Sequence, residues 1–488
     1  MTKHAIIIGA GIGGLGTACL LAKAGWRVTV LEKNEQVGGR AGKFTAQGFT
    51  FDTGPSWYLM PEVFQKFFAL IGEDVHDHLT LHKLSPSYRV FFKDQDLQVD
   101  MWGDAAKDRQ TFESIQPGAG KQLDKYLARS SYIYKTAMDH ILYKNTDRVV
   151  DFLSPQLALR ASKLSLFSSM NRYVHKYFKD PRLQQLMQYQ LAFLGASPYN
   201  APALYSLMSH IDYKQGVYYP EGGLYQVIRS LEKLAKKHGT VIHLKSPVEK
   251  IIVTDGKASG VIVDGKKLHA DVVISNADPH HTEHSLLQPD NRDHSEAYWA
   301  SRTLAPSALL MYLGVNRRYD NLQHHSLVFS KHWYSNFRQL YNDPQWPTDP
   351  SFYVCAPSRT DPTVAPKGME NLFVIVPVAA ALDYAEVELE EYADMILHTM
   401  QNQMNLPGLH KSIVFKRLFA VKDFEARFNS LGGTSLGLAH TLRQTGPFRP
   451  SNKSKKVQDL YYVGANVHPG IGLPTCLISA QLVAARLI

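Results

Sequence analysis

The stretch Ala5-Ile6-Ile7-Ile8-Gly9-Ala10-Gly11-Ile12-Gly13-Gly14 decides how the chain begins to fold. Its apolar, β-branched start predicts a strand over residues 4–8, and the composition after it predicts a helix over residues 15–24. The pattern Gly9-x-Gly11-x-x-Gly14 lies between the two, which is the context that makes such glycines meaningful. The stretch therefore predicts a strand, tight turn and helix that bind a dinucleotide.

Each glycine has a separate task in this turn. Gly9 permits the sharp bend, Gly11 lets backbone approach a pyrophosphate, and Gly14 lets the helix pack on the strand. The phosphates are expected at the positive N-terminus of the helix. Glu32 follows the next predicted strand, residues 26–31. At this position a carboxylate can accept hydrogen bonds from a ribose. The cofactor contacts expected from this half are Gly9, Gly11, Gly13, Gly14, Glu32 and Lys33.

Further along, the chain divides into stretches of different pattern. Residues 60–190 contain few glycines and are expected to be mostly helical, whereas residues 300–420 look like a separate sheet with its own helices. Turns are expected at Asp255-Gly256 and Asp264-Gly265. Strands are predicted over residues 241–244, 249–253, 258–263, 271–275, 308–313, 352–355, 372–378, 413–418 and 460–464, and helices over 224–239, 387–404 and 480–488.

Length and composition limit the class of protein. A chain of 488 residues is expected to form two or three domains. No run of about 18 uncharged apolar residues occurs, so we expect no spanning helix. The first apolar residues lead into the glycine turn, at the point where the apolar stretch of a signal peptide would go on, so we expect no signal peptide. The three scattered cysteines favour a reducing cytoplasm without disulfides or a zinc site.

The formal charge of +9 predicts attraction to an anionic partner. No nucleic-acid module accompanies it, so we expect no nucleic-acid binding. Residues 125–182 hold eleven Lys/Arg against four Asp, interleaved with aromatic residues. This composition suits a surface that sits on anionic lipid, and a solvated helical face is the alternative interpretation.

A second glycine turn separates FAD from NAD as the expected cofactor. Together with the first turn and Glu32, Gly38-Gly39-Arg40 resembles the amine oxidase and carotenoid desaturase branch of flavoproteins. The resemblance implies that this turn approaches FAD, with Arg40 as a phosphate partner. It also implies that the C-terminal segment places a helix N-terminus beneath the flavin ring. The further contacts that it implies are Gly39, Arg40, Gly54, Pro55, Val248, Gly464, Ala465, Gly472, Leu473 and Pro474.

Several short blocks narrow the resemblance to the bacterial and fungal phytoene desaturase family. They include Gly54-Pro55, Gly216-Val217-Tyr218-Tyr219-Pro220, Phe448-Arg449-Pro450 and His468-Pro469-Gly470, in this order. Membership implies desaturation of a carotenoid precursor by hydride transfer to FAD. The same family includes desaturases of C30 and hydroxylated carotenoids, oxidases and isomerases. These alternatives stay open, as does a flavin amine oxidase.

The resemblance also implies a fold, partners and a location. We expect an α/β Rossmann-like FAD-binding domain from residues 1–75, 222–290 and 440–488, and an inserted α+β substrate domain from 76–120, 190–221 and 291–439. Residues 121–189 would form a helical segment that associates with a membrane. The expected partners are an apolar polyene, an anionic membrane surface that the protein binds peripherally on its cytoplasmic side, and quinone or oxygen as electron acceptor.

One histidine cluster invites a metal interpretation. His280-His281-x-x-His284 follows a predicted helix start, with Glu283 as its nearby carboxylate. A solvated helix is the favoured interpretation, so no metal ligand is predicted. Asp151, Arg172 and His175 could lie near a substrate tunnel, but the sequence does not distinguish them from ordinary helix-face residues. No catalytic residue is predicted.

Overall fold

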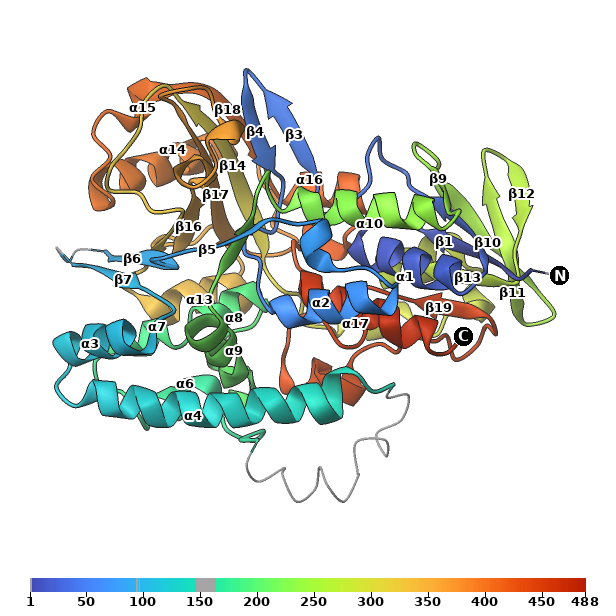
Figure 1. Cartoon of the computed structure of the whole chain (residues 1–488), viewed down its shortest axis with the longest axis horizontal. Helices are drawn as coiled ribbons and strands as arrows, with labels where there is room; N and C mark the ends of the chain where they lie inside the picture. Colours follow the sequence, from blue (N-terminus) through green and yellow to red (C-terminus); the bar gives the residue numbers. More distant parts are fainter. Residues whose placement is uncertain (1, 94, 96, 146–163) are drawn as a thin grey trace.

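A five-stranded parallel sheet is built from both ends of the chain and from its middle (Figure 1). The computed structural model describes residues 2–93, 95, 97–145 and 164–488; Asp151 and its neighbours in 146–163 lie outside the described residues. In spatial order the strands are β19 (Leu460–Tyr462), β13 (Val272–Ser275), β1 (His4–Ile8), β2 (Arg27–Leu31) and β9 (Val241–His243).

Both faces of this sheet are covered because its strands alternate apolar side chains between two layers. Ala5 and Ile7 of β1 pack in the helical layer, whereas Ile6 and Ile8 pack against an antiparallel meander. The helices are α1 (Ile12–Lys23), α2 (Pro61–Leu70), α10 (Tyr225–Lys237) and α17 (Leu473–Ala484). The meander is β10 (Val248–Thr254), β11 (Lys257–Val263) and β12 (Lys266–His269).

A second, seven-stranded mixed sheet forms the other half of the molecule (Figure 1). In spatial order its strands are β18 (Ile413–Phe419), β14 (Ser307–Val315), β17 (Glu370–Val378), β16 (Phe352–Cys355), β15 (His325–Phe329), β6 (Tyr88–Phe92) and β7 (Gln98–Met101). There are also two antiparallel two-stranded sheets: β3 (Lys43–Ala46) with β4 (Phe49–Asp52), and β5 (Leu81–Lys83) with β8 (Tyr218–Pro220), whose strands are far apart in the chain.

Helices cover the two faces of the mixed sheet. On one face packs α14 (Glu386–Gln403), followed by α15 (Leu409–Ser412). On the other lies a helical layer that shares a core with the sheet. It contains α3 (Ala105–Ile115), α4 (Ala119–Ala137), α6 (Met170–Val174), α7 (Pro181–Leu186), α8 (Gln190–Phe193), α9 (Leu207–His210) and α13 (Trp333–Tyr341). Shorter helices are α11 (Pro279–His281), α12 (Glu296–Ala300) and α16 (Val421–Phe428).

Among the described residues of 60–190 helices predominate, as expected, but the strands β5, β6 and β7 also lie there and are not predicted. Of these, β6 pairs in parallel with β15, more than 200 positions later in the chain. A local pattern does not reveal such a partner. The predicted turns at Asp255-Gly256 and Asp264-Gly265 are confirmed, because all four residues have positive φ, as hairpin turns require.

The aromatic residues of the basic segment 125–182 mostly face inward. Tyr134, Tyr173 and Phe178 are 7%, 5% and 0% exposed, so they belong to the core. Phe167 is the opposite case, since 91% of it is exposed. Among the described residues, no helix is both long and apolar enough to cross a membrane.

Candidate functional site

One cavity of about 1000 Å³ is lined by residues of both sheets and of the helical layer. Of the predicted cofactor contacts, only Gly14 does not line it. The lining residues among them are Gly9, Gly11, Gly13, Glu32, Lys33, Gly39, Arg40, Gly54, Pro55, Val248, Gly464, Ala465, Gly472, Leu473 and Pro474. The fold thus brings together residues that are more than 460 positions apart in the chain.

The glycine turn leaves the N-terminus of α1 open to an anion. Gly11 is the N-cap and contributes no capping side chain, and the first turn of the helix contains no acid. Asn276 Oδ1 accepts from the N–H of Gly14 at 3.0 Å, so the N–H groups of Ile12 and Gly13 are the ones that can meet phosphate oxygens. Gly14 has the packing role expected of it, because a Cβ there would collide with the carbonyl oxygen of Gly9.

Glu32 is tied to the glycine turn. Its Oε2 accepts a hydrogen bond from the N–H of Ala10 at 2.7 Å, and its Oε1 accepts from the N–H and the Nδ2 of Asn34, both at 2.9 Å. The carboxylate is 4% exposed. The side chain is therefore held in one orientation at the edge of the cavity.

The two predicted cations are held by α16 and the loop after it. Lys33 Nζ donates to Asn429 Oδ1 at 2.7 Å and to the carbonyl oxygen of Ala426 at 3.0 Å. Arg40 Nη2 donates to Ser430 Oγ at 2.6 Å. Burial lowers the pKa of both cations. The position of Arg40 along the cavity fits a phosphate partner that is oriented in advance, and Lys33 places a second cation in the same wall.

A second open helix N-terminus faces the cavity from the C-terminal end of the chain. Gly472, with φ of 127°, is the N-cap of α17, whose first turn has neither a capping side chain nor an acid. The two ends of the chain meet here, because a Cβ on Gly13 would lie 3.3 Å from Gly464 Cα. Two helix N-termini with glycine at the N-cap, a fixed carboxylate and two cations make a set of polar groups that fits FAD.

Beyond the cofactor half, the cavity continues as an apolar chamber beneath the helical layer. Among the described lining residues the only acids are Glu32 and Asp278, and both lie in the cofactor half. Trp57 stacks on His325 at 4.7 Å between ring centroids. The chamber includes Leu59, Met60, Ile141, Leu142, Leu164, Leu166, Phe193, Leu204, Leu207, Leu310, Leu327, Phe329 and Phe337.

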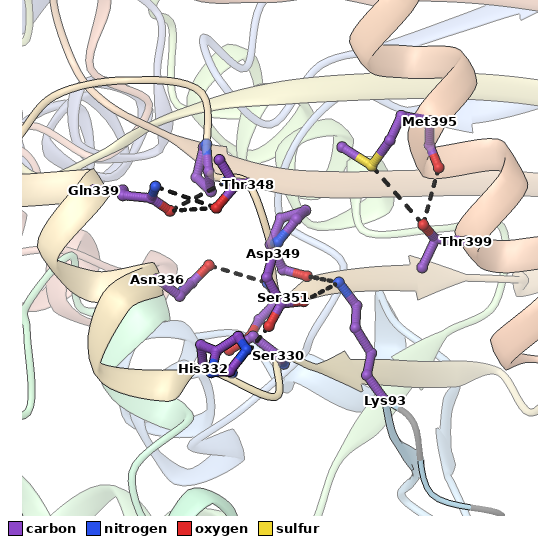
Figure 2. A network of polar contacts seen from close by, with 12 residues as sticks. Lys93, Ser330, His332, Asn336, Gln339, Thr348, Asp349, Ser351, Met395 and Thr399 are labelled. Atoms are coloured by element: carbon purple, nitrogen blue, oxygen red, sulfur yellow. Dashed lines mark hydrogen bonds and ion pairs between the residues drawn. The ribbon is translucent and has the colours of Figure 1, made fainter.

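A buried polar network supports the end of the chamber near α13 (Figure 2). Lys93 Nζ donates to Asp349 Oδ1 at 2.8 Å and to the carbonyl oxygen of Pro350 at 2.7 Å. The N–H of Ser351 donates to Asn336 Oδ1 at 3.2 Å, and both of these residues line the cavity. The network thus fixes the loop before β16 against α13.

Sequence reasoning missed His440, which lies in the wall of the cavity. It is 4% exposed, stacks on Tyr205 at 5.2 Å, and has no hydrogen-bond partner at either ring nitrogen. No motif includes this residue, so only the fold reveals it. Of the residues named as tunnel candidates, Arg172 and His175 are exposed and do not line the cavity.

The structure corrects the interpretation of the histidine cluster as a solvated helix. The segment is helical, because α11 continues as a π-helix over Thr282–Leu286, but it is half buried rather than solvated, with Glu283 1% exposed. The carboxylate of Glu283 is hydrogen-bonded to His294 Nδ1 and to Trp299 Nε1, so it does not face the cluster. His280 and His284 instead face Glu296, at 3.6 and 2.7 Å. A second group with possible metal-ligand geometry, His324, His325 and Cys355, is buried.

Comparisons with known proteins agree with this geometry. A family model described as flavin containing amine oxidoreductase matches residues 12–488. The chain is 44% identical to a carotenoid 3,4-desaturase of Haloarcula japonica over 486 residues, which is 99% of this chain and 97% of that relative. It is 37% identical to a zeta-carotene-forming phytoene desaturase of Myxococcus xanthus over 495 residues, which is 100% of this chain and 94% of that relative.

A solved structure shows the same fold at low identity. Putrescine oxidase bound to putrescine superposes with a TM-score of 0.65 at 16% identity, covering 100% of this chain and 99% of that one. The protein is an FAD-dependent oxidoreductase. The chain belongs to the flavin-containing amine oxidoreductase family and, within it, to the carotenoid desaturases.

Proposed function

We propose that the protein desaturates a carotenoid-type polyene, with FAD as the oxidant. The observation that carries the proposal is the continuity of the cavity, which runs from the cofactor half into a long apolar chamber. Bound FAD supplies a two-electron acceptor for hydride. The apolar walls bind the polyene through burial of hydrocarbon surface, and they exclude water from the reacting carbons.

The walls of the chamber argue against a flavin amine oxidase. An ammonium group entering the chamber would need a carboxylate or a cage of polar and aromatic groups. The described lining residues outside the cofactor half include no acid. Aromatic rings are present, but Trp57 is already stacked face to face with His325.

Polyene binding gives the helical segment 121–189 a role at a membrane surface. A polyene dissolved in a bilayer must pass from the bilayer into the cavity of the protein. Exposed Phe167 directly follows Leu166, which lines the cavity, and Phe448, another lining residue, is 51% exposed. Nearby, Lys125, Arg129 and Lys176 line a small open pocket with tyrosines. We therefore propose peripheral binding to anionic lipid, on the cytoplasmic side.

The finer organisation follows from the same proposal. Residues 1–75, 222–290 and 440–488 form the FAD-binding domain, and 76–120, 190–221 and 291–439 form the inserted substrate domain. Reduced FAD then needs an acceptor, for which quinone in the same bilayer and oxygen are the candidates.

Replacement of Phe167 and Lys176 by Ser should lower sedimentation with vesicles of anionic lipid, but not turnover of detergent-dispersed substrate. Unchanged sedimentation contradicts the membrane proposal.

Product analysis tests the function. The gene is expressed in hosts that supply a C30 or a C40 precursor, and extracted pigments are identified by mass. Desaturation lowers the mass by two hydrogens for each step and shifts absorption toward the visible, whereas an isomerase leaves the mass unchanged and an oxygenase raises it. Failure to convert either precursor, combined with activity on amines, contradicts the proposal.

A further inference from the structure

His440 is the feature of the cavity that the proposed function does not yet use. Its ring lies in the wall of the cavity, and both of its ring nitrogens are buried without a partner. An imidazole always carries one nitrogen that can accept a proton when it is neutral. Leaving such a group unpaired in an apolar cavity is costly, which calls for an explanation.

The position of the ring is fixed by its neighbours. It stacks nearly parallel on Tyr205, with an interplanar angle of 18°, and the Tyr205 hydroxyl is joined to Thr445 Oγ1 at 2.8 Å. Gly470 lies against the Nε2 edge of the ring, because a Cβ on this glycine would lie 2.5 Å from His440 Nε2. Gly470 precedes the N-cap of α17 by two residues, so the imidazole lies beside the segment that is expected to hold the flavin.

Arg449 adds a positive charge next to the ring. Its guanidinium is 4% exposed and donates to the carbonyl oxygens of Leu438 and Ala465, at 3.2 and 2.7 Å. Burial, together with this charge, holds the pKa of His440 well below its usual range. The imidazole is therefore neutral before turnover and does not retain a proton after it.

We propose that His440 is the catalytic proton acceptor of the desaturation, an assignment that rests on the proposed function. Two C–H bonds on adjacent carbons break. One hydrogen leaves with its electron pair as a hydride that reduces the FAD by two electrons. The other leaves as a proton to a ring nitrogen of His440, and its bonding pair becomes the new π bond. Atoms and electrons balance without another reactant.

A weak base is sufficient for this step. Loss of hydride develops a delocalised allylic cation, whose neighbouring C–H bond is strongly acidic. Other titratable groups of the described wall serve less well. His281 is hydrogen-bonded to Asn429 Nδ2 at 3.0 Å, and His468 already has an interaction partner within the chain. Burial raises the pKa of the Cys476 thiol to about 12, so it stays protonated. Burial raises the pKa of Tyr205 to about 12 and that of Tyr353 further, so both stay protonated. The acids of the cofactor half are already engaged, Glu32 with Ala10 and Asp278 with Asn466.

The test is single turnover of the FAD-loaded enzyme without oxygen, followed as bleaching of the flavin absorbance by a polyene. H440F keeps a ring against Tyr205 and removes both nitrogens. We expect it to retain FAD occupancy and to bleach about 100-fold more slowly. The substrate concentration for half-saturation should stay nearly unchanged. H175F is the matched control, because His175 is exposed and does not line the cavity, and it should bleach at nearly the wild-type rate.

Chemical rescue separates proton transfer from packing. In H440A, added imidazole should restore the bleaching rate, whereas thiazole, a ring of similar size and much lower basicity, should not. Equal rescue by both rings, or undiminished bleaching by H440F while the wild type is active, overturns the assignment. If the wild-type enzyme bleaches with neither a C30 nor a C40 polyene, the proposed function fails and the assignment fails with it.

Discussion

Glu32 at the end of β2 accepts a hydrogen bond from the backbone N–H of Ala10, with 2.7 Å between Oε2 and N. The residue expected to bind a ribose thus also holds the glycine turn in place. Since Oε1 is occupied by Asn34, both oxygens of the carboxylate have protein partners. The turn is therefore shaped before FAD enters.

Replacing Glu32 with Gln should weaken FAD binding. The amide keeps the size of the side chain but loses the charge, and a hydrogen bond to a charged group contributes about 1.5–3 kcal/mol. We expect the Kd of the apoprotein for FAD to rise at least about tenfold, since 1.4 kcal/mol corresponds to a factor of ten. Titration by flavin fluorescence measures it. E35Q is the control, because Glu35 is exposed and pairs with Arg427 outside the turn. An unchanged Kd in E32Q contradicts this role.

Asn276 connects the two ends of the chain, and its removal should destabilise the FAD-binding part. Its Oδ1 accepts from the N–H of Gly14 at 3.0 Å, and its Nδ2 donates to the carbonyl oxygen of Val463 at 2.8 Å. With about 1 kcal/mol for each hydrogen bond, N276A should lower the free energy of unfolding by about 2 kcal/mol. Urea unfolding measures the change. The exposed N402A serves as control, and equal midpoints for the two variants would exclude the connecting role.

Local sequence patterns could predict the FAD half of the site but not the chamber. The glycine turn, the strand His4–Ile8 and the turns at Asp255 and Asp264 depend on neighbouring residues, so they could be predicted from the sequence. The chamber depends on contacts between distant segments. The local sequence does not predict β15, because its pairing with β16 and β6 makes this segment a strand. His440 belongs to no periodic pattern.

Composition also failed to predict which side chains are buried and which are exposed. The spacing of basic and aromatic residues in 125–182 does not reveal which rings face the core. Tyr173 and Phe178 do so, whereas Phe167 does not. In the histidine cluster, Glu283 has the right spacing for a ligand, yet its side chain turns toward Trp299. Glu296, which faces the cluster, comes from the next helix.

The pair of Lys93 and Asp349 should be coupled in stability. The two side chains are 9% and 23% exposed, with 2.8 Å between Nζ and Oδ1. Removing one member of a well-buried ion pair costs about 3–5 kcal/mol, and the partial exposure here reduces this to about 2 kcal/mol. K93M and D349N should each destabilise, and the double variant should lose less than the sum. Additive losses in urea unfolding contradict coupling. R338M breaks the exposed pair of Arg338 with Asp343 and is the control.

Asp212 should make the stability of the protein depend on pH. Its Oδ2 accepts from Tyr189 Oη at 2.7 Å, Tyr88 Oη at 2.9 Å and Gln190 Nε2 at 3.0 Å, in a site that is 5% exposed. Burial raises its pKa to about 6, against the partial opposition of these hydrogen bonds. A raised carboxyl pKa means that the folded state binds the proton more tightly than the unfolded state does.

The sign follows from this difference. Between about pH 4 and pH 6 the unfolded carboxyl is ionised while the folded one is still protonated, so the free energy of unfolding falls as pH rises, and above about pH 6 the loss is complete. Two pKa units correspond to about 3 kcal/mol. D212N keeps an acceptor oxygen for the three donors and removes the titration. The wild type should therefore lose stability relative to D212N between pH 4.5 and pH 7, as measured by urea unfolding, whereas the exposed D290N should follow the wild type. A difference between wild type and D212N that does not change with pH rules out this titration.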